Sequence, residues 1–140
     1  GVRQLRASLL IPLRDSVGML HSLQFIGADG SKRFLTGGRM AGCYFSMGVP
    51  VGSLLLCEGY ATAASLYRAT GWACAVAFNC GNLLAVARAL RVKFPRMRIV
   101  VCADNDIATP GNPGVTKATE AARAVGGYVA TPRFKGAAHV

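Results

Sequence analysis

The sequence predicts an α/β protein in which a mostly parallel four-stranded sheet, flanked by helices, follows a small antiparallel β meander. After residue 50, apolar runs typical of strands buried on both faces alternate with helical patterns. Before that residue, short β-forming runs are separated by turn residues. Hydrophobic residues make up 52% of the 140 residues and charged residues only 16%, so the chain can form a core. We therefore expect a β-rich N-terminal subdomain over residues 1–50 and an α/β domain over residues 51–140.

The meander is predicted from three runs in the first part of the chain, SLLIPLR, MLHSLQFI and KRFLTG. Residues 15–18 and 27–31 separate these runs, and both separators carry turn residues. The second separator contains Asp29-Gly30, a strong hairpin signal. A looser connection rich in glycine follows, from residue 37 to residue 50.

The second part of the chain is predicted to alternate strand and helix. The helices end at glycines 71 and 126 or before a proline, which are common stop signals. Helical connections between consecutive strands make the sheet mostly parallel. We expect strands at residues 53–57, 73–78, 98–103 and 128–131, and helices at residues 61–70, 82–94 and 115–125.

Charge and cysteine content limit the class of protein. Sixteen Lys and Arg against six Asp and Glu give a net charge of +10, which favours an anionic partner such as nucleic acid. Five cysteines without C-x-x-C spacing argue against a zinc site and fit a reducing cytoplasm. The uncharged stretch 69–87 is interrupted by Asn79-Cys80-Gly81-Asn82, a turn signal, so we expect no membrane segment. Because the first residue is Gly and no signal peptide is recognisable, we expect a cytoplasmic piece of a longer protein.

Three of the six acidic residues directly follow predicted strands. Glu58 follows the first strand, and Asp104 and Asp106 follow the third. In parallel sheets this edge binds ligands, and residues two apart in an extended segment project the same way. Neighbouring carboxylates repel one another unless a cation neutralises them, and such oxygen ligands suit Mg²⁺. Either group alone would be interpreted as a turn residue or a solvated strand end, but together they predict a metal site that faces phosphates.

Basic residues beside turns and glycines are the candidate phosphate contacts. Arg14, Lys32 and Arg39 lie in the predicted meander and its following loop, where backbone and phosphate can approach closely. A second cluster, between residues 88 and 98, fits a solvated helix face as well as a nucleic-acid surface. His21 is not part of a nucleophile pattern and is expected to be structural.

These motifs resemble those of the Toprim domain, which bacterial-type DNA primases, topoisomerases, recombination mediators and some nucleases share. The resemblance rests on L-L-L-C-E-G-Y-A-T-A, on V-V-C-A-D-N-D, and on G-x-x-x-A-x-x-A-A-R-A near the end of the chain. Upstream, L-I-P-L-R-D and K-R-F-L resemble the strand-rich segment that precedes Toprim in primase catalytic cores. This part looks most similar to primases of phages, plasmids and conjugative elements.

The resemblance implies a Toprim fold and a primase core, which uses Mg²⁺, or Mn²⁺ in its place, to make short RNA primers on single-stranded DNA. It implies that Glu58 is a general acid/base or metal ligand and that Asp104 and Asp106 hold the metal. Arg14, Lys32 and Arg39 would contact template and nucleotide. The implied partners are single-stranded DNA, ribonucleoside triphosphates and, through domains outside this chain, a replicative helicase.

The sequence departs from primases in two respects. Residues 134–140 lack the further acidic motif that primases usually carry after the fourth strand, and residues 1–50 contain no zinc-ribbon module, which primases often have. The fragment alone is therefore expected to bind metal and DNA weakly and to make no primers. Two alternatives remain open: a Toprim nuclease or topoisomerase-type strand-cleaving enzyme, for which the four tyrosines offer no clear nucleophile, and a non-catalytic nucleic-acid-binding module.

Overall fold

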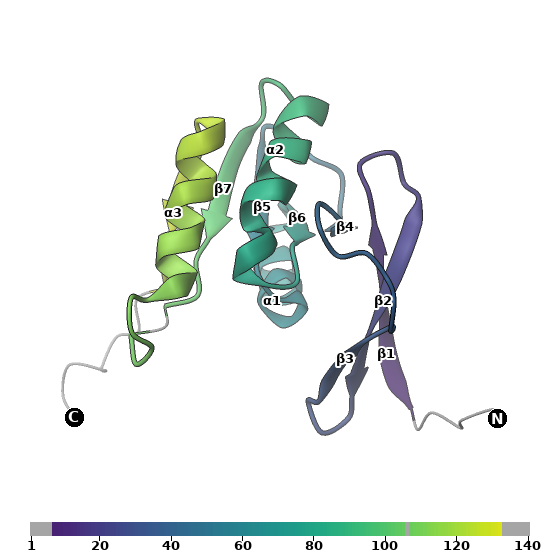
Figure 1. Cartoon of the computed structure of the whole chain (residues 1–140). Coiled ribbons are helices and arrows are strands. Elements are labelled where there is room, and N and C mark those ends of the chain that lie inside the picture. The colour runs from purple at the N-terminus through teal and green to yellow at the C-terminus, as the bar shows by residue number, and fades with distance from the viewer. Residues whose placement is uncertain (1–6, 106, 133–140) are drawn as a thin grey trace.

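The computed structural model describes residues 7–105 and 107–132. Two sheets organise it, one three-stranded in the order β1-β2-β3 and one five-stranded in the order β4-β6-β5-β7-β8 (Figure 1). The α/β prediction is confirmed. The elements are β1 (Ser8–Arg14), β2 (Leu20–Gly27), β3 (Lys32–Phe34), β4 (Phe45–Met47), β5 (Ser53–Cys57), α1 (Tyr60–Thr70), β6 (Ala73–Val76), the short 3₁₀ helix η1 (Cys80–Asn82), α2 (Leu83–Lys93), β7 (Arg98–Cys102), α3 (Pro113–Val125) and β8 (Tyr128–Ala130).

The three-stranded sheet is the predicted antiparallel meander. Its second turn is held by the side chain of Asp29, which accepts a hydrogen bond from the backbone N–H of Ser31 (2.9 Å). Gly30 adopts the left-handed backbone conformation (φ 83°) that this turn requires. The two turns of the meander lie at opposite ends of the sheet, because β2 runs between them.

The larger sheet contains the four predicted parallel strands and one more. β6, β5, β7 and β8 are parallel, whereas β4 pairs antiparallel with β6 at the edge. The sequence predicts only a loose connection at residues 45–47. Three residues are too few to show the alternation of a strand, and their partner strand β6 lies almost thirty residues further along the chain. β4 precedes residue 50 yet belongs to this sheet, and the division of the chain at residue 50 stays a prediction.

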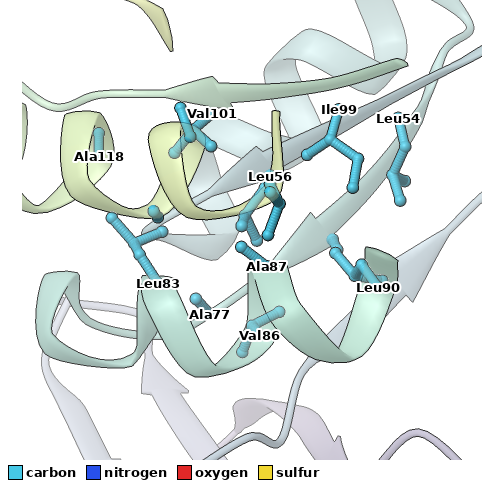
Figure 2. Packing of buried hydrophobic residues seen from close by; sticks show 14 of the residues in the cluster. Leu54, Leu56, Ala77, Leu83, Val86, Ala87, Leu90, Ile99, Val101 and Ala118 are labelled. Carbon is cyan, nitrogen blue, oxygen red and sulfur yellow. The ribbon is translucent and has the colours of Figure 1, made fainter. Parts of the chain in front are cut away.

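The five-stranded sheet is covered on both faces. On one face, α2 and α3 pack against side chains from the central strands, such as Leu56 and Val101 (Figure 2). The helical period predicted for residues 82–94 has its physical cause here, since Leu83, Val86 and Leu90 are all buried. On the other face lie α1 and the inner side of the meander, which share a second cluster of buried residues that includes Ile11, Leu13, Leu55, Cys57 and Ala63.

Among the described helices, none has both the length and the apolar character needed to cross a bilayer.

Candidate functional site at the carboxyl edge of the parallel sheet

Glu58 and Asp104 follow the ends of two strands that are neighbours in the sheet. Cys57, the last residue of β5, is paired in register with Cys102, the last residue of β7. Glu58 therefore follows one strand directly, and Asp104 follows the adjacent strand after one intervening residue. Both residues are half-buried, and the Oε2 atom of Glu58 is shielded from solvent. The structure thus brings the ends of the two acidic motifs to one edge of the sheet.

The third predicted acid, Asp106, lies outside the described residues. Within residues 7–105 and 107–132, no three or more His, Cys, Asp or Glu side chains form a group that could hold a metal ion. Glu58 and Asp104 offer carboxylate oxygens only, which is the donor chemistry that Mg²⁺ prefers when it keeps several waters. The donor set fits Mg²⁺, and the roles of the three acids stay predictions.

The segment after β7 is fastened to the start of α3. The side-chain N–H of Asn112 donates a hydrogen bond to Oδ1 of Asn105 (2.8 Å), next to Asp104. Asn112 has a left-handed backbone (φ 42°) and is followed by Pro113 at the first position of the helix. The contact limits the motion of the chain that carries Asp104. Sequence reasoning missed it, although Asn-Pro at a helix start is a recognisable signal.

Three thiols lie beneath the acidic edge, one from each central strand. Cys57, Cys74 and Cys102 project to the α1 side of the sheet, and all five cysteines of the chain are free. The thiol of Cys57 donates to the sulfur of Cys102, which raises the pKa of Cys57 and lowers the pKa of Cys102. Burial raises the pKa of Cys74 to about 11. The layer below the carboxylates is therefore thiol-rich, and two of its three thiols, Cys57 and Cys74, are held in the uncharged form.

The predicted basic residues do not form one group. Arg14 pairs with Leu20 and Lys32 pairs with Ile26 six residues further along β2, which separates them by about 20 Å at the usual rise per residue. Phe34, two residues after Lys32, packs edge-to-face on Phe78 with ring centroids 6.0 Å apart, just past the carboxyl end of β6. Lys32 is thus on the side of the acids, whereas Arg14 is at the other end of the meander.

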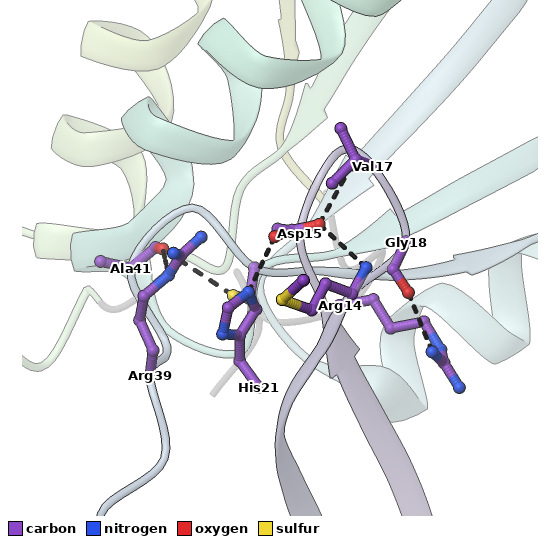
Figure 3. Close-up of polar contacts among 9 residues, drawn as sticks. Arg14, Asp15, Val17, Gly18, His21, Arg39 and Ala41 are labelled. Carbon is purple, nitrogen blue, oxygen red and sulfur yellow. Dashed lines mark hydrogen bonds and ion pairs between the residues drawn. The ribbon is translucent and has the colours of Figure 1, made fainter.

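The Arg14 end of the meander is organised by Asp15. Its carboxylate pairs with His21 (2.8 Å) and accepts hydrogen bonds from the backbone N–H groups of Val17 and Met19 (Figure 3). The hydrogen bond from His21 is the main reason that the pKa of Asp15 is lowered. His21 therefore has the structural partner that its predicted role requires.

Arg39 lies in the loop between β3 and β4. Its Nε donates to the carbonyl oxygen of Ala41 (3.2 Å), and its side chain is otherwise exposed (Figure 3). The same loop is hydrogen bonded to Asn82 at the start of α2, which follows the carboxyl end of β6. Its loop is thus linked to the carboxyl end of β6, as β3 is through the contact of Phe34 with Phe78.

Two residues that support these elements escaped the sequence analysis. The sequence pattern predicts a turn at Asn82, but its side chain is buried and hydrogen bonded to three backbone carbonyls. Arg91 belongs to the basic cluster between residues 88 and 98, and its guanidinium donates hydrogen bonds to the carbonyl oxygens of Val125 (2.9 Å) and Met97 (2.6 Å). A polar residue at a helix start and a long basic side chain near a helix end are common on protein surfaces, so the sequence only weakly indicates the buried contacts of Asn82 and Arg91.

Comparison with solved structures gives a shared fold. The primase fragment of the bacteriophage T7 primase-helicase protein aligns with 90% of this chain and 53% of its own, with a TM-score of 0.63 and 13% identity. The DnaG primase catalytic domain bound to single-stranded DNA aligns with 91% of this chain and 45% of its own, with a TM-score of 0.60 and 15% identity. At these identities the likeness concerns the fold alone.

Comparison at the sequence level gives the family. Two Escherichia coli proteins named DNA primase TraC are 44% and 41% identical over 133 residues, or 89% of this chain. The chain spans only 12% and 9% of the length of these relatives. Residues 53–132, more than half of the chain, match the family model for the Toprim domain. The chain therefore belongs to the Toprim domain family.

Proposed function

We propose that this chain is the catalytic core of a DNA primase, which transfers nucleotides from ribonucleoside triphosphates to a growing primer on single-stranded DNA. The observation that carries the proposal is the placement of Glu58 and Asp104 at the ends of neighbouring strands, in a chain 44% identical to a protein named DNA primase. Because the chain corresponds to about a tenth of that protein, the activity of the whole remains part of the proposal.

The acids divide the chemical work in this proposal. Asp104 and Asp106 would hold Mg²⁺, with Mn²⁺ as a substitute, and Glu58 would act as general acid/base or as a further ligand. A bound Mg²⁺ supplies positive charge that orients a triphosphate and stabilises charge developing on its oxygens. Two of the thiols beneath add no competing charge, since the hydrogen bond with Cys102 and burial raise the pKa of Cys57, and burial raises the pKa of Cys74.

Exposed basic residues would contact the substrates. Lys32 and Arg39 are exposed, and Lys32 lies at the acidic end of the meander. With a net charge of +10, the chain attracts both single-stranded DNA and ribonucleoside triphosphates. A replicative helicase, reached through other domains, is the proposed protein partner, in keeping with the primase-helicase named among the structural relatives. We place this activity in the cytoplasm, where template and triphosphates are found.

The proposal is tested by primer synthesis in two settings. The first is this chain alone, and the second is a chimera in which it replaces the matching region of the Escherichia coli DNA primase TraC. Both are incubated with single-stranded DNA, ribonucleoside triphosphates and either Mg²⁺ or Mn²⁺. We expect short oligoribonucleotides from the chimera and none from the chimera with Asp104→Asn.

A matched control is Glu120→Gln, which removes a carboxylate from the exposed face of α3 and breaks only an ion pair with Lys117 (3.5 Å). This control should keep wild-type primer synthesis. Full synthesis by the Asp104→Asn chimera would contradict the catalytic role and favour a non-catalytic nucleic-acid-binding module. Cleavage of the DNA without primer synthesis would favour the strand-cleaving alternative.

A further inference from the structure

A pocket of about 260 Å³ lies at the end of the molecule away from the acids, between the β1–β2 turn, β4 and the end of α2. Arg14 and Lys93 line it, together with Tyr44 and Ser46, whose side chains carry hydroxyl groups. Figure 1 shows the β1–β2 turn and the end of α2 at the same upper end of the fold. These residues come from three segments that are far apart in the sequence, and the fold brings them together.

The two cations of this pocket are not neutralised by carboxylates. The Nη1 atom of Arg14 donates to the carbonyl oxygen of Gly18 (2.9 Å), and Nζ of Lys93 donates to the carbonyl oxygen of Ser16 (3.4 Å). In the part of the chain that the structure describes, neither forms an ion pair. Both positive charges are thus held at one turn by neutral partners.

Asp15 is the acidic residue of the pocket lining, and it is already engaged. Its carboxylate pairs with His21 at 2.8 Å and accepts two backbone N–H groups from its own turn. Two cations therefore outweigh one carboxylate whose oxygens point to other partners. The pocket favours an anion.

The surface beside the pocket extends the positive charge. A second pocket, of about 450 Å³, shares Lys93 and is also lined by Arg96. This end of the sheet is its amino end, because the backbone N–H of Arg98 at the start of β7 donates to Gly52 just before β5. The five residues of β5 lie between this end and Glu58, a distance of about 16 Å along the strand. Cations thus gather at the end of the sheet opposite to the acids.

We propose that the pocket between Arg14 and Lys93 binds a phosphate group, at a site separate from the acidic edge. The guanidinium of Arg14 can bind two phosphate oxygens at once, and Lys93 adds a point charge. Its volume is below that of pockets for drug-sized ligands, so it admits a phosphate group rather than a whole nucleotide. The phosphate belongs either to a polynucleotide backbone or to a free nucleotide. The site uses none of the three acids and does not depend on nucleotidyl transfer.

The test measures binding without divalent metal, so that no metal ion at the acidic edge holds a phosphate. Fluorescence anisotropy follows a short labelled single-stranded oligonucleotide over a range of salt concentrations, and NMR follows titration with ATP. We compare Arg14→Ala and Lys93→Ala with Arg88→Ala, which removes the same charge from an exposed position on α2. Lys93→Gln adds a variant at this exposed position that removes the charge and keeps a polar side chain only one atom shorter.

We expect Arg14→Ala and Lys93→Ala each to weaken oligonucleotide binding about threefold to tenfold and to lower the salt slope by about 0.7, as for one lost phosphate contact. Arg88→Ala should leave both values near wild type. If ATP binding falls in the same variants, the phosphate can come from a free nucleotide; if only oligonucleotide binding falls, it comes from the backbone. Equal effects of Arg88→Ala and Lys93→Ala, or unchanged binding of both ligands by all the variants, would overturn the proposal.

Discussion

The side-chain amide of Asn82 donates a hydrogen bond to the carbonyl oxygen of Cys43, 39 residues earlier in the chain (3.1 Å). The same amide also reaches the carbonyl oxygens of Met40 (3.1 Å) and Ala77 (2.9 Å), and Oδ1 accepts from the backbone N–H of Gly42 (2.9 Å). One buried side chain therefore joins the start of α2 to the loop that links the meander to the larger sheet.

Replacing Asn82 by Ala should destabilise the protein. The substitution leaves a buried N–H and several buried carbonyls without their partner, which costs about 2–3 kcal/mol in the free energy of unfolding. Urea denaturation followed by circular dichroism measures this loss. Asn79→Ala is the comparison, because it removes a more exposed cap of η1 and should cost about 1 kcal/mol. Equal losses in the two variants would show that the buried contacts of Asn82 contribute little.

Arg91 and Arg88 lie one helical turn apart on α2, and they should differ sharply when mutated. Arg91→Ala removes hydrogen bonds to the carbonyls of Val125 and Met97, which connect α2 to the end of α3 and to the approach to β7. We expect a loss of about 2 kcal/mol in unfolding free energy, since hydrogen bonds from a charged donor contribute more to stability than neutral hydrogen bonds do. Arg88 is exposed, so Arg88→Ala should stay within about 0.5 kcal/mol of wild type. Thermal and urea unfolding measure the stability of both variants. Equal stabilities would contradict the predicted difference between Arg91 and Arg88.

The pairing of Asp15 with His21 makes stability depend on pH in the acid range. The pKa of Asp15 is lowered from its ordinary value of 3.8, first by the hydrogen bond from His21. A lowered folded-state pKa gives stability that is fully present above the unfolded value and is lost as the pH falls through the folded value. The difference in melting temperature between wild type and Asp15→Asn should therefore shrink as the pH falls below about 5.

His21→Gln tests the cause of that pH dependence. It removes the partner that contributes most to the lowered pKa of Asp15 and leaves the backbone N–H groups of Val17 and Met19 in place. Melting curves of this variant should show a smaller loss of stability on acidification than wild type. If His21→Gln lost as much stability on acidification as wild type, the pH dependence would come from the backbone N–H groups of Val17 and Met19 alone.

Local sequence patterns predict most of the fold, and they predict that Glu58 and Asp104 each follow the end of a strand. Strand runs, helical periodicity and turn residues predict the meander and all four parallel strands, because each element is encoded within its own residues. The meeting of Glu58 with Asp104 required more, namely that β5 and β7 are neighbours although β6 lies between them in the sequence. Strand order depends on tertiary packing, so the sequence predicts that Glu58 lies near Asp104 only if the two strands are neighbours.

The positions of the basic residues relative to one another depend on the same distinction between local and tertiary structure. Arg14 flanks the first turn of the meander and Lys32 flanks the second, and consecutive turns of a meander lie at opposite ends. That separation was available from the sequence once the meander had been predicted. The proximity of Lys93 to Ser16 was not, because it depends on how α2 packs beside the meander. Contacts between side chains and backbone carbonyls, such as those of Asn82, leave no periodic trace at all.

Glu58→Gln distinguishes an enzyme from a binding module in the proposed function. The change keeps the size of the side chain and removes its charge, half-buried beside the acid motif of the neighbouring strand. If Glu58 acts as general acid/base, primer synthesis by the chimera should fall on the order of 10²–10⁴-fold, the usual contribution of a positioned acid or base. Binding of single-stranded DNA should stay the same or tighten, because a negative charge that faces phosphate is lost. Gel analysis of primers and anisotropy of labelled DNA measure the two effects on one preparation, with circular dichroism as the check on folding. Wild-type primer synthesis by a folded Glu58→Gln protein would refute the catalytic assignment, whereas lost synthesis with lost DNA binding would point to a disrupted edge rather than a missing acid.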